Sequence, residues 1–170
     1  MTHTDIVAGI DLGTTNSLIA VYQEKNVRIV EIEGDRLLPS YVGLSPSNEL
    51  LVGHSARNQY ILFPEKTIKS VKRMMGGTET IVLGERSFQP EDVSALILSH
   101  LKKQAENQFG IPIKRAVITV PAYFNDIQRH ATRTAGEIAG LEVVRIVNEP
   151  TAASLAFQNS MLEEDRSAGH

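Results

Sequence analysis

The pattern of apolar and polar positions predicts that strands come first along this chain and that helices follow. Two apolar runs without alternation, at residues 6–10 and 18–22, are typical of strands that are buried on both faces. Residues 27–32 alternate apolar and charged side chains, which predicts a half-buried strand. Apolar segments at residues 41–44 and 50–52, on either side of a Ser-Pro-Ser-Asn turn, predict two short strands.

A less regular stretch lies in the middle of the chain. Residues 54–63 favour a helix, which Pro64 would stop because a proline disfavours helical backbone in the residue before it. Residues 67–75 place Ile68, Val71 and Met75 on one side, as an amphipathic helix would, and two glycines follow. We therefore expect two short helical segments here.

The second half alternates helices and strands. Residues 90–110 keep helical spacing, begin with acidic residues and end at a glycine. Residues 116–120 then predict a buried strand. Residues 125–140 predict a helix that starts with an N-cap asparagine and ends at a glycine. Residues 143–147 predict another strand, and a third helix is expected to begin at Pro150.

This order of elements predicts an α/β fold of the ribonuclease-H-like kind. Three strands are followed by alternating helices and strands, which suits one mixed five-stranded sheet with helices on both faces. Active-site atoms in such sheets gather at the carboxyl ends of strands. Asp11, Pro121 and the Asn148-Glu149 pair all fall at predicted strand ends, so we expect a site there.

Composition narrows the class of protein without naming a function. The chain has 170 residues, 42% of them hydrophobic, which is enough for one compact domain. With 17 basic and 20 acidic residues the net charge is -3, so we expect neither a nucleic-acid nor a membrane partner. The absence of cysteine excludes disulfides and thiol chemistry, and the N-terminus lacks the pattern of a secretion signal. We expect a cytoplasmic protein.

The sequence GIDLGTTNS at residues 9–17 is the strongest local signal for chemistry. Asp11 ends a buried strand, where a carboxylate can hold the water shell of a magnesium ion. Gly13 permits close approach of the backbone to an anion, while Thr14 and Thr15 add hydroxyl donors to the N–H groups of the turn. A second strand follows directly, unlike the strand-to-helix loop of P-loop proteins. The same residues are also good formers of an ordinary hairpin turn.

Four segments together resemble the ATPase domain of the DnaK type, in the heat shock protein 70 family. They are GIDLGTTNS (9–17), LVGHSA (51–56), VKRMMG (71–76) and the long stretch from ITVPAYFND to EPTAASLAF (118–157). The resemblance implies an actin-like ATPase fold that binds ATP or ADP with Mg. It also implies a molecular chaperone that couples ATP hydrolysis to the binding of unfolded polypeptides. A short segment after Lys72, together with SLIAVY, is more similar to the HscC branch.

The resemblance implies a role for several residues of the site. Asp11 matches the acidic residue that holds magnesium through water. Lys72 matches the lysine that reaches the γ-phosphate, and Glu149 matches the carboxylate that orients the attacking water. The first phosphate loop of the family is matched by Gly13, Thr14, Thr15 and Asn16. Without the resemblance, Lys72 could belong to a solvated basic face, and Glu149 could be a charge favoured by a helix dipole.

A second group of residues matches family positions that couple the nucleotide to the substrate domain. These positions are Pro121, Tyr123, Asp126 and Arg129. Pro121 would act as a switch near Lys72 and Glu149, with Arg129 as its relay. Pro121 could instead simply end a strand, and Arg129 could pair with Asp126 one helical turn away.

The resemblance also predicts how the chain is organised. Residues 1–159 would form the first lobe of the ATPase domain, with a shortened α/β insertion subdomain at about residues 34–90. Residues 160–170 would be a mobile tail or a truncation point, and the second lobe and the substrate-binding domain would be missing. We therefore expect weak or no ATPase activity from the isolated chain. The implied partners are unfolded clients, a J-domain co-chaperone and a nucleotide exchange factor.

Two other classes of function remain open at this point. One is a sugar or acetate kinase of the actin-like group, which would transfer the phosphate to a small molecule. The other is a partner-binding lobe without catalysis. The VPAYFND and NEPTAA segments argue against the kinase, and the presence of both Lys72 and Glu149 argues against a non-catalytic parent.

Overall fold

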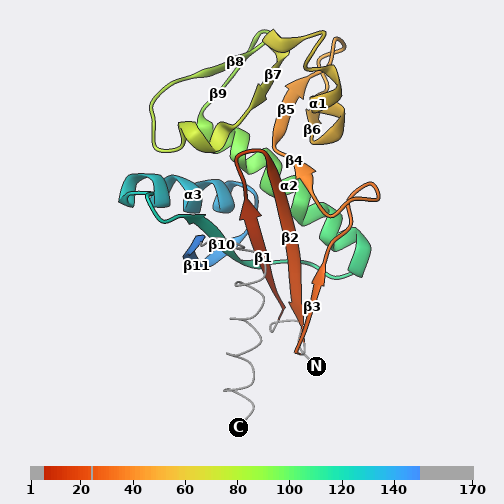
Figure 1. Cartoon of the computed structure of the whole chain (residues 1–170), viewed down its shortest axis with the longest axis vertical. Helices are drawn as coiled ribbons and strands as arrows, with labels where there is room; N and C mark the ends of the chain where they lie inside the picture. Colours follow the sequence, from red (N-terminus) through yellow and green to blue (C-terminus); the bar gives the residue numbers. More distant parts are fainter. Residues whose placement is uncertain (1–5, 24, 150–170) are drawn as a thin grey trace.

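The main sheet is mixed and has six strands in the computed structural model, which describes residues 6–23 and 25–149. The strands are β1 (Val7–Leu12), β2 (Asn16–Gln23), β3 (Asn26–Ile29), β4 (Leu38–Pro39), β10 (Arg115–Pro121) and β11 (Glu142–Glu149). They follow the order β11-β10-β1-β2-β3, and the short β4 pairs with β2 (Figure 1). β1, β10 and β11 are mutually parallel, whereas β2 is antiparallel to its neighbours. The predicted five-stranded mixed sheet is therefore confirmed, with β4 as an added sixth strand.

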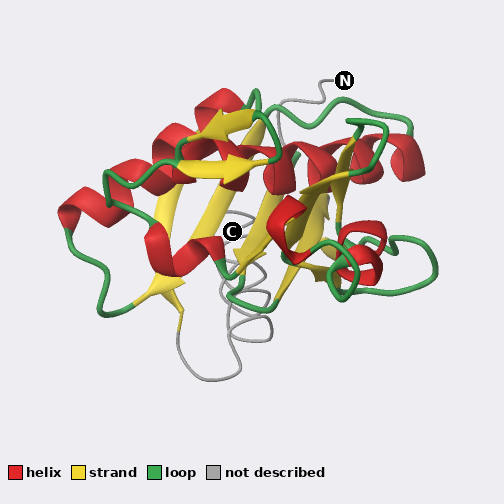
Figure 2. Ribbon diagram, turned by 90° about the horizontal axis from the view of Figure 1, so that it is seen from above, coloured by secondary structure: helices red, strands yellow, loops and turns green. Residues whose placement is uncertain are grey.

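Two long helices, α2 (Pro90–Phe109) and α3 (Asp126–Ile138), lie side by side on one face of this sheet (Figure 2). α3 begins with a reciprocal capping box of Asn125 with Gln128, and at the start of α2 the N–H of Gln89 donates to Asp92 Oδ2 (3.0 Å). α2 ends at Gly110, whose left-handed φ of 68° suits a glycine. The helix predicted from Pro150 lies outside the described residues, so helical cover of the other face stays a prediction.

The side chains of each strand alternate between the two faces of the sheet, and this alternation separates the core from the site. Ala8 and Ile10 of β1 and Ile118 of β10 are at most 1% exposed, and they belong to the core that includes α2 and α3. Asp11 and Thr119, one residue further along each strand, therefore face the other side. The helices stabilise the sheet without covering these two polar side chains.

A smaller α/β unit is inserted between β4 and α2. A three-stranded sheet of order β6-β5-β7 and a hairpin of β8 with β9 accompany one short helix (Figure 1). The elements are β5 (Tyr41–Leu44), β6 (Leu50–Val52), α1 (His54–Gln59), β7 (Thr67–Lys69), β8 (Ile81–Leu83) and β9 (Arg86–Phe88). The strands at 41–44 and 50–52 have the predicted bounds, whereas the hairpin was not predicted.

The amphipathic helix expected at residues 67–75 was a wrong prediction. Thr67–Lys69 instead forms β7, which pairs with β5, and Ser70 then takes a left-handed φ of 59° before the 3-10 helix η3 (Val71–Met74). The helix expected at 54–63 also ends early, at Gln59. The side chain of Gln59 donates hydrogen bonds to Leu44 O and to Thr67 Oγ1, so tertiary pairing in the small sheet outweighs local helical spacing.

Similarly, β3 ends before the predicted residue 32. Ile32 and Asp35 exchange two backbone hydrogen bonds of 2.6 and 3.0 Å across a turn. Both Val30 and Ile32 are 0% exposed, which explains why their apolar pattern extends past the strand. Among the described residues, no helix is both long enough and apolar enough to cross a membrane.

We expect His100 on α2 to make the free energy of unfolding depend on pH. Burial lowers the pKa of His100 from 6.5, with a smaller opposing effect of Glu33 and a smaller lowering by Lys103. The Nε2 atom of this ring is buried and makes no hydrogen bond within the described part of the chain. Because the unfolded chain then binds more protons, the free energy of unfolding should fall as the pH drops below 6.5 toward the lower folded pKa.

The His100→Gln variant should lose less stability than the unsubstituted chain between about pH 7.5 and about pH 5.5. Urea midpoints at the two pH values measure the difference. Equal losses in both proteins would show that another group carries the pH dependence.

Candidate functional site

Three predicted site residues lie at the same edge of the main sheet. Because β1, β10 and β11 run parallel, their carboxyl ends meet there. Asp11 is opposite Thr119 in the register of β1 with β10, and Pro121 is opposite Glu149 in the register of β10 with β11. The backbone of Glu149 ends β11, while its side chain lies outside the description. The sheet topology thus brings the predicted strand ends together.

The loop of residues 13–15 joins β1 to β2 at this edge and is tightly folded. A Cβ atom at Gly13 would lie 2.0 Å from Asn16 O, so only glycine fits the observed backbone. Thr14 is half-buried and Thr15 is exposed. Ser40 donates its N–H to Thr15 O (2.8 Å) and its hydroxyl to Gly13 O (2.9 Å). The loop is therefore held by a residue far away in the sequence.

Thr119 is a candidate site residue that sequence reasoning missed. It is 3% exposed, and its hydroxyl lies 3.2 Å from Asp11 Oδ1 and 3.5 Å from Ile10 O. Asp11 itself is half-buried. A hydroxyl that donates to one carboxylate oxygen limits the rotation of the carboxylate. The available signal was a threonine within an otherwise apolar buried run at residues 116–120.

Under the Mg-ATP binding that the resemblance implies, replacing Thr119 by valine should weaken the Mg-dependent part of that binding about fivefold. The substitution removes one hydrogen bond to Asp11 while keeping the side-chain shape. The Thr119→Ser variant keeps the hydroxyl and serves as the control. Titration of ATP binding with and without Mg²⁺ measures the effect. Equal Mg dependence in the valine variant and the unsubstituted chain would contradict a role in orienting Asp11.

Lys72 lies in η3 and does not belong to a solvated basic face. It is 5% exposed, whereas its neighbours Lys69 and Arg73 are exposed. η3 is followed by Met75, whose sulfur accepts a hydrogen bond from Ser94 of α2 (3.3 Å). A Cβ at the next residue, Gly76, would lie 2.9 Å from the side chain of Gln128 in the first turn of α3.

The contacts of Met75 and Gly76 place η3 over α2 and the start of α3. Since α3 follows the carboxyl end of β10, the segment that carries Lys72 borders the same edge of the sheet as Asp11.

The predicted coupling residues lie at the end of β10, in the turn that follows it and in α3. Pro121 is the last residue of β10, Asp126 is the exposed first residue of α3, and Tyr123 is 74% exposed beside Phe124. The guanidinium of Arg129 donates to Phe124 O (3.1 Å) and to Asn148 Oδ1.

Arg129 therefore connects α3 to β11 next to Glu149, through Asn148. The sequence placed Asn148 at a strand end but did not indicate this contact. In the described part of the chain, Arg129 forms no ion pair with Asp126.

The residues at this edge fit the magnesium nucleotide that the resemblance implies. There is no group of three His, Cys, Asp or Glu side chains that could coordinate a metal ion within residues 6–23 and 25–149. The half-buried carboxylate of Asp11 suits Mg²⁺, which keeps several of its waters and takes few protein ligands. The tight backbone at Gly13 suits an anion that approaches the loop closely.

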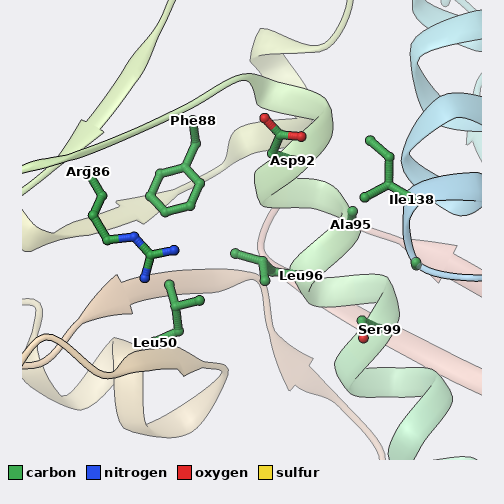
Figure 3. Close-up of a pocket in the computed structure, with 9 residues that line it drawn as sticks. Leu50, Arg86, Phe88, Asp92, Ala95, Leu96, Ser99 and Ile138 are labelled. Carbon is green, nitrogen blue, oxygen red and sulfur yellow. The ribbon is translucent and has the colours of Figure 1, made fainter.

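A separate cavity of about 320 Å³ lies away from this edge, and no predicted site residue lines it. In Figure 3, Arg86 and Phe88 of β9 face Leu96 of α2 across it, with Ile138 of α3 at its far side. Its lining residues are Leu50, Arg86, Phe88, Asp92, Ala95, Leu96, Ser99, Ile138 and Ala139.

The mixed sheet and the residues at its carboxyl edge define an α/β lobe of the actin-like ATPase class. The family model described as Hsp70 protein matches residues 7–81 and 77–166. The chaperone protein DnaK of Thermotoga neapolitana is 54% identical over 155 residues, and that of Thermosipho melanesiensis is 52% identical over 155 residues. Each match covers 90% of this chain and 26% of the relative. The chain belongs to the Hsp70 family, and it spans about a quarter of the length of these relatives.

Proposed function

We propose that this chain is the first lobe of the ATPase domain of a DnaK-type chaperone, with residues 1–159 as the lobe. Its function is to bind the magnesium-bound phosphate tail of ATP and to supply groups for hydrolysis. One observation supports the proposal most strongly. Asp11, the 13–15 loop held by Ser40 and the segment that carries the buried Lys72 all lie near one edge of the sheet.

Each group has a role that follows from its chemistry. When bound, Mg²⁺ would supply positive charge that offsets the negative charge of the phosphates. Asp11, oriented by Thr119, would accept hydrogen bonds from the waters of that ion. Backbone N–H groups of the loop, the hydroxyls of Thr14 and Thr15, and the amide of Asn16 would donate to phosphate oxygens. Lys72 would follow charge onto the transferring phosphoryl group.

Hydrolysis further requires a water positioned for attack, and Glu149 is the residue we propose for that role. Phosphoryl transfer to water is mostly positioning and charge neutralisation, so no covalent step on the protein is needed. The kinase and the non-catalytic alternatives are not favoured, because the matching family model is described as Hsp70 protein and both relatives are named chaperone protein DnaK.

We further propose that Pro121, Tyr123, Asp126 and Arg129 couple this site to a substrate domain elsewhere in the protein. The contact from Arg129 to Asn148, directly before Glu149, supports such a connection. The proposed partners are unfolded polypeptide clients, a J-domain co-chaperone and a nucleotide exchange factor. The HscC branch and a cytoplasmic location also stay predictions.

The isolated chain should bind Mg-ATP about 1000-fold more weakly than a DnaK relative of full length, and it should show little or no turnover. The reason is that about 4 kcal/mol of nucleotide contacts would come from the second lobe. Calorimetry or amide chemical shifts measure the affinity, with the full-length Thermotoga neapolitana DnaK as the control. Micromolar binding with turnover by the isolated chain would contradict this division of the site.

A further inference from the structure

Ser40 lies where the main sheet meets the three-stranded sheet, and it contacts the 13–15 loop. It lies between β4, which pairs with β2 in the main sheet, and β5, which starts the smaller sheet. The residue is 2% exposed. Its N–H donates to Thr15 O and its hydroxyl donates to Gly13 O, so that one buried residue holds two carbonyl groups of the loop.

A second buried hydroxyl orients the first. The Oγ atoms of Ser17 and Ser40 are 2.9 Å apart, and Ser17 is 0% exposed. A serine hydroxyl has only one hydrogen to donate. Because Ser40 donates its hydrogen to Gly13 O, Ser17 must donate to Ser40. The two hydrogen bonds therefore run in one direction, from Ser17 to Ser40 and from Ser40 to the carbonyl of Gly13.

The planarity of the peptide group converts this contact into an orientation for the loop. The carbonyl of Gly13 and the N–H of Thr14 belong to one peptide unit, and in a trans peptide they point in opposite directions. The described part of the chain contains no cis peptide bond. With the Gly13 carbonyl directed at Ser40, the Thr14 N–H points away from the buried serines. A carbonyl at that position would instead repel an anion.

We propose that Ser40 is a positioning residue for phosphate binding: it holds the Gly13 carbonyl inward so that the Thr14 N–H faces the phosphates of bound nucleotide. The inference rests on the proposed function of the 13–15 loop. It adds a residue outside the loop, 27 positions from Gly13, that determines whether the loop can bind an anion.

The test compares Ser40→Ala with Ser17→Ala in the full chain. Both variants lose a buried hydroxyl of the same pair, but Ser17→Ala leaves the bond from Ser40 to Gly13 O in place. In the ligand-free protein, the amide signal of Thr14 should move in Ser40→Ala and stay in Ser17→Ala. Mg-ATP binding, followed by loop amide shifts, should weaken about tenfold in Ser40→Ala and less than about twofold in Ser17→Ala.

The outcomes separate this inference from the proposed function. If Mg-ATP shifts no loop amide in the unsubstituted chain, the proposed function fails. If the two serine variants change the Thr14 amide and the affinity equally, or if Ser40→Ala changes neither, the positioning role of Ser40 is overturned. Thermal unfolding of both variants shows whether their losses of stability are comparable.

If Ser40→Ala does not fold, a measurement on the unsubstituted chain still tests the proposal. Bound Mg-ATP should slow hydrogen exchange of the Ser40 amide, since this N–H donates to Thr15 O and an ordered loop opens less often. Loop amide shifts without slower exchange at Ser40 would overturn the proposal.

Discussion

The Lys72→Met variant should hydrolyse ATP about 100-fold to 1000-fold more slowly, which corresponds to about 3 to 4 kcal/mol of transition-state stabilisation. Lys72 is 5% exposed, and the attraction between a cation and a phosphate is stronger where less water surrounds them. Methionine keeps the unbranched shape of the stem and removes the charge. Ground-state binding of ATP should change less than the rate, because charge on the transferring group develops during the reaction.

The measurement needs a complete ATPase domain. The chain can replace the matching segment of Thermotoga neapolitana DnaK, to which it is 54% identical over 155 residues. Single-turnover hydrolysis then reports the chemical step. Lys69→Met is the matched control, since Lys69 is exposed on β7 and its ammonium lies 4.8 Å from the ring centroid of Tyr60. A Lys72→Met rate within threefold of the parent would contradict the proposed role.

Gly13→Ala should weaken Mg-ATP binding about 100-fold, or about 2.7 kcal/mol. The new Cβ would lie 2.0 Å from Asn16 O and 3.2 Å from Asn16 C, so the loop backbone has to move. Gly13 is not among the glycines with positive φ, which makes the effect steric rather than conformational. Displacement of the loop also removes the carbonyl of Gly13 from the Ser40 hydroxyl. Amide shifts of the loop during an Mg-ATP titration measure the loss.

Gly136→Ala controls for a general loss of stability. A Cβ there would lie 2.4 Å from Val143 Cγ2, where α3 packs closely on β11. We expect a loss of about 1 to 3 kcal/mol in unfolding free energy with unchanged nucleotide affinity below the melting transition. If both alanine variants weaken binding equally, the loop at Gly13 has no specific role.

Much of the fold could be predicted because the relevant patterns are local. The helix expected at residues 90–110 is Pro90–Phe109, and the strand expected at 116–120 lies within Arg115–Pro121. The helix predicted at residues 67–75 was wrong for a nonlocal reason. Thr67–Lys69 pairs with β5, a strand that lies earlier in the sequence at Tyr41–Leu44. Helical spacing of three apolar residues is a weaker preference than a sheet edge that offers backbone partners.

For the candidate site, too, the local sequence predicts one part and long-range contacts decide the other. The sequence alone indicates the type of chemistry, because a carboxylate at a strand end and a Gly-Thr-Thr turn are contiguous residues whose properties need no distant partner. It does not indicate what orients them. Thr119 reaches Asp11 across 108 positions, and Ser40 reaches Gly13 across 27, because sheet pairing brings these segments together.

The burial of Lys72 likewise depends on how η3 packs against α2 and α3. Which groups are present is therefore a property of the local sequence. Their orientation and their separation from solvent depend on long-range packing, since the free energy of a polar contact is determined by the distance and burial of both partners.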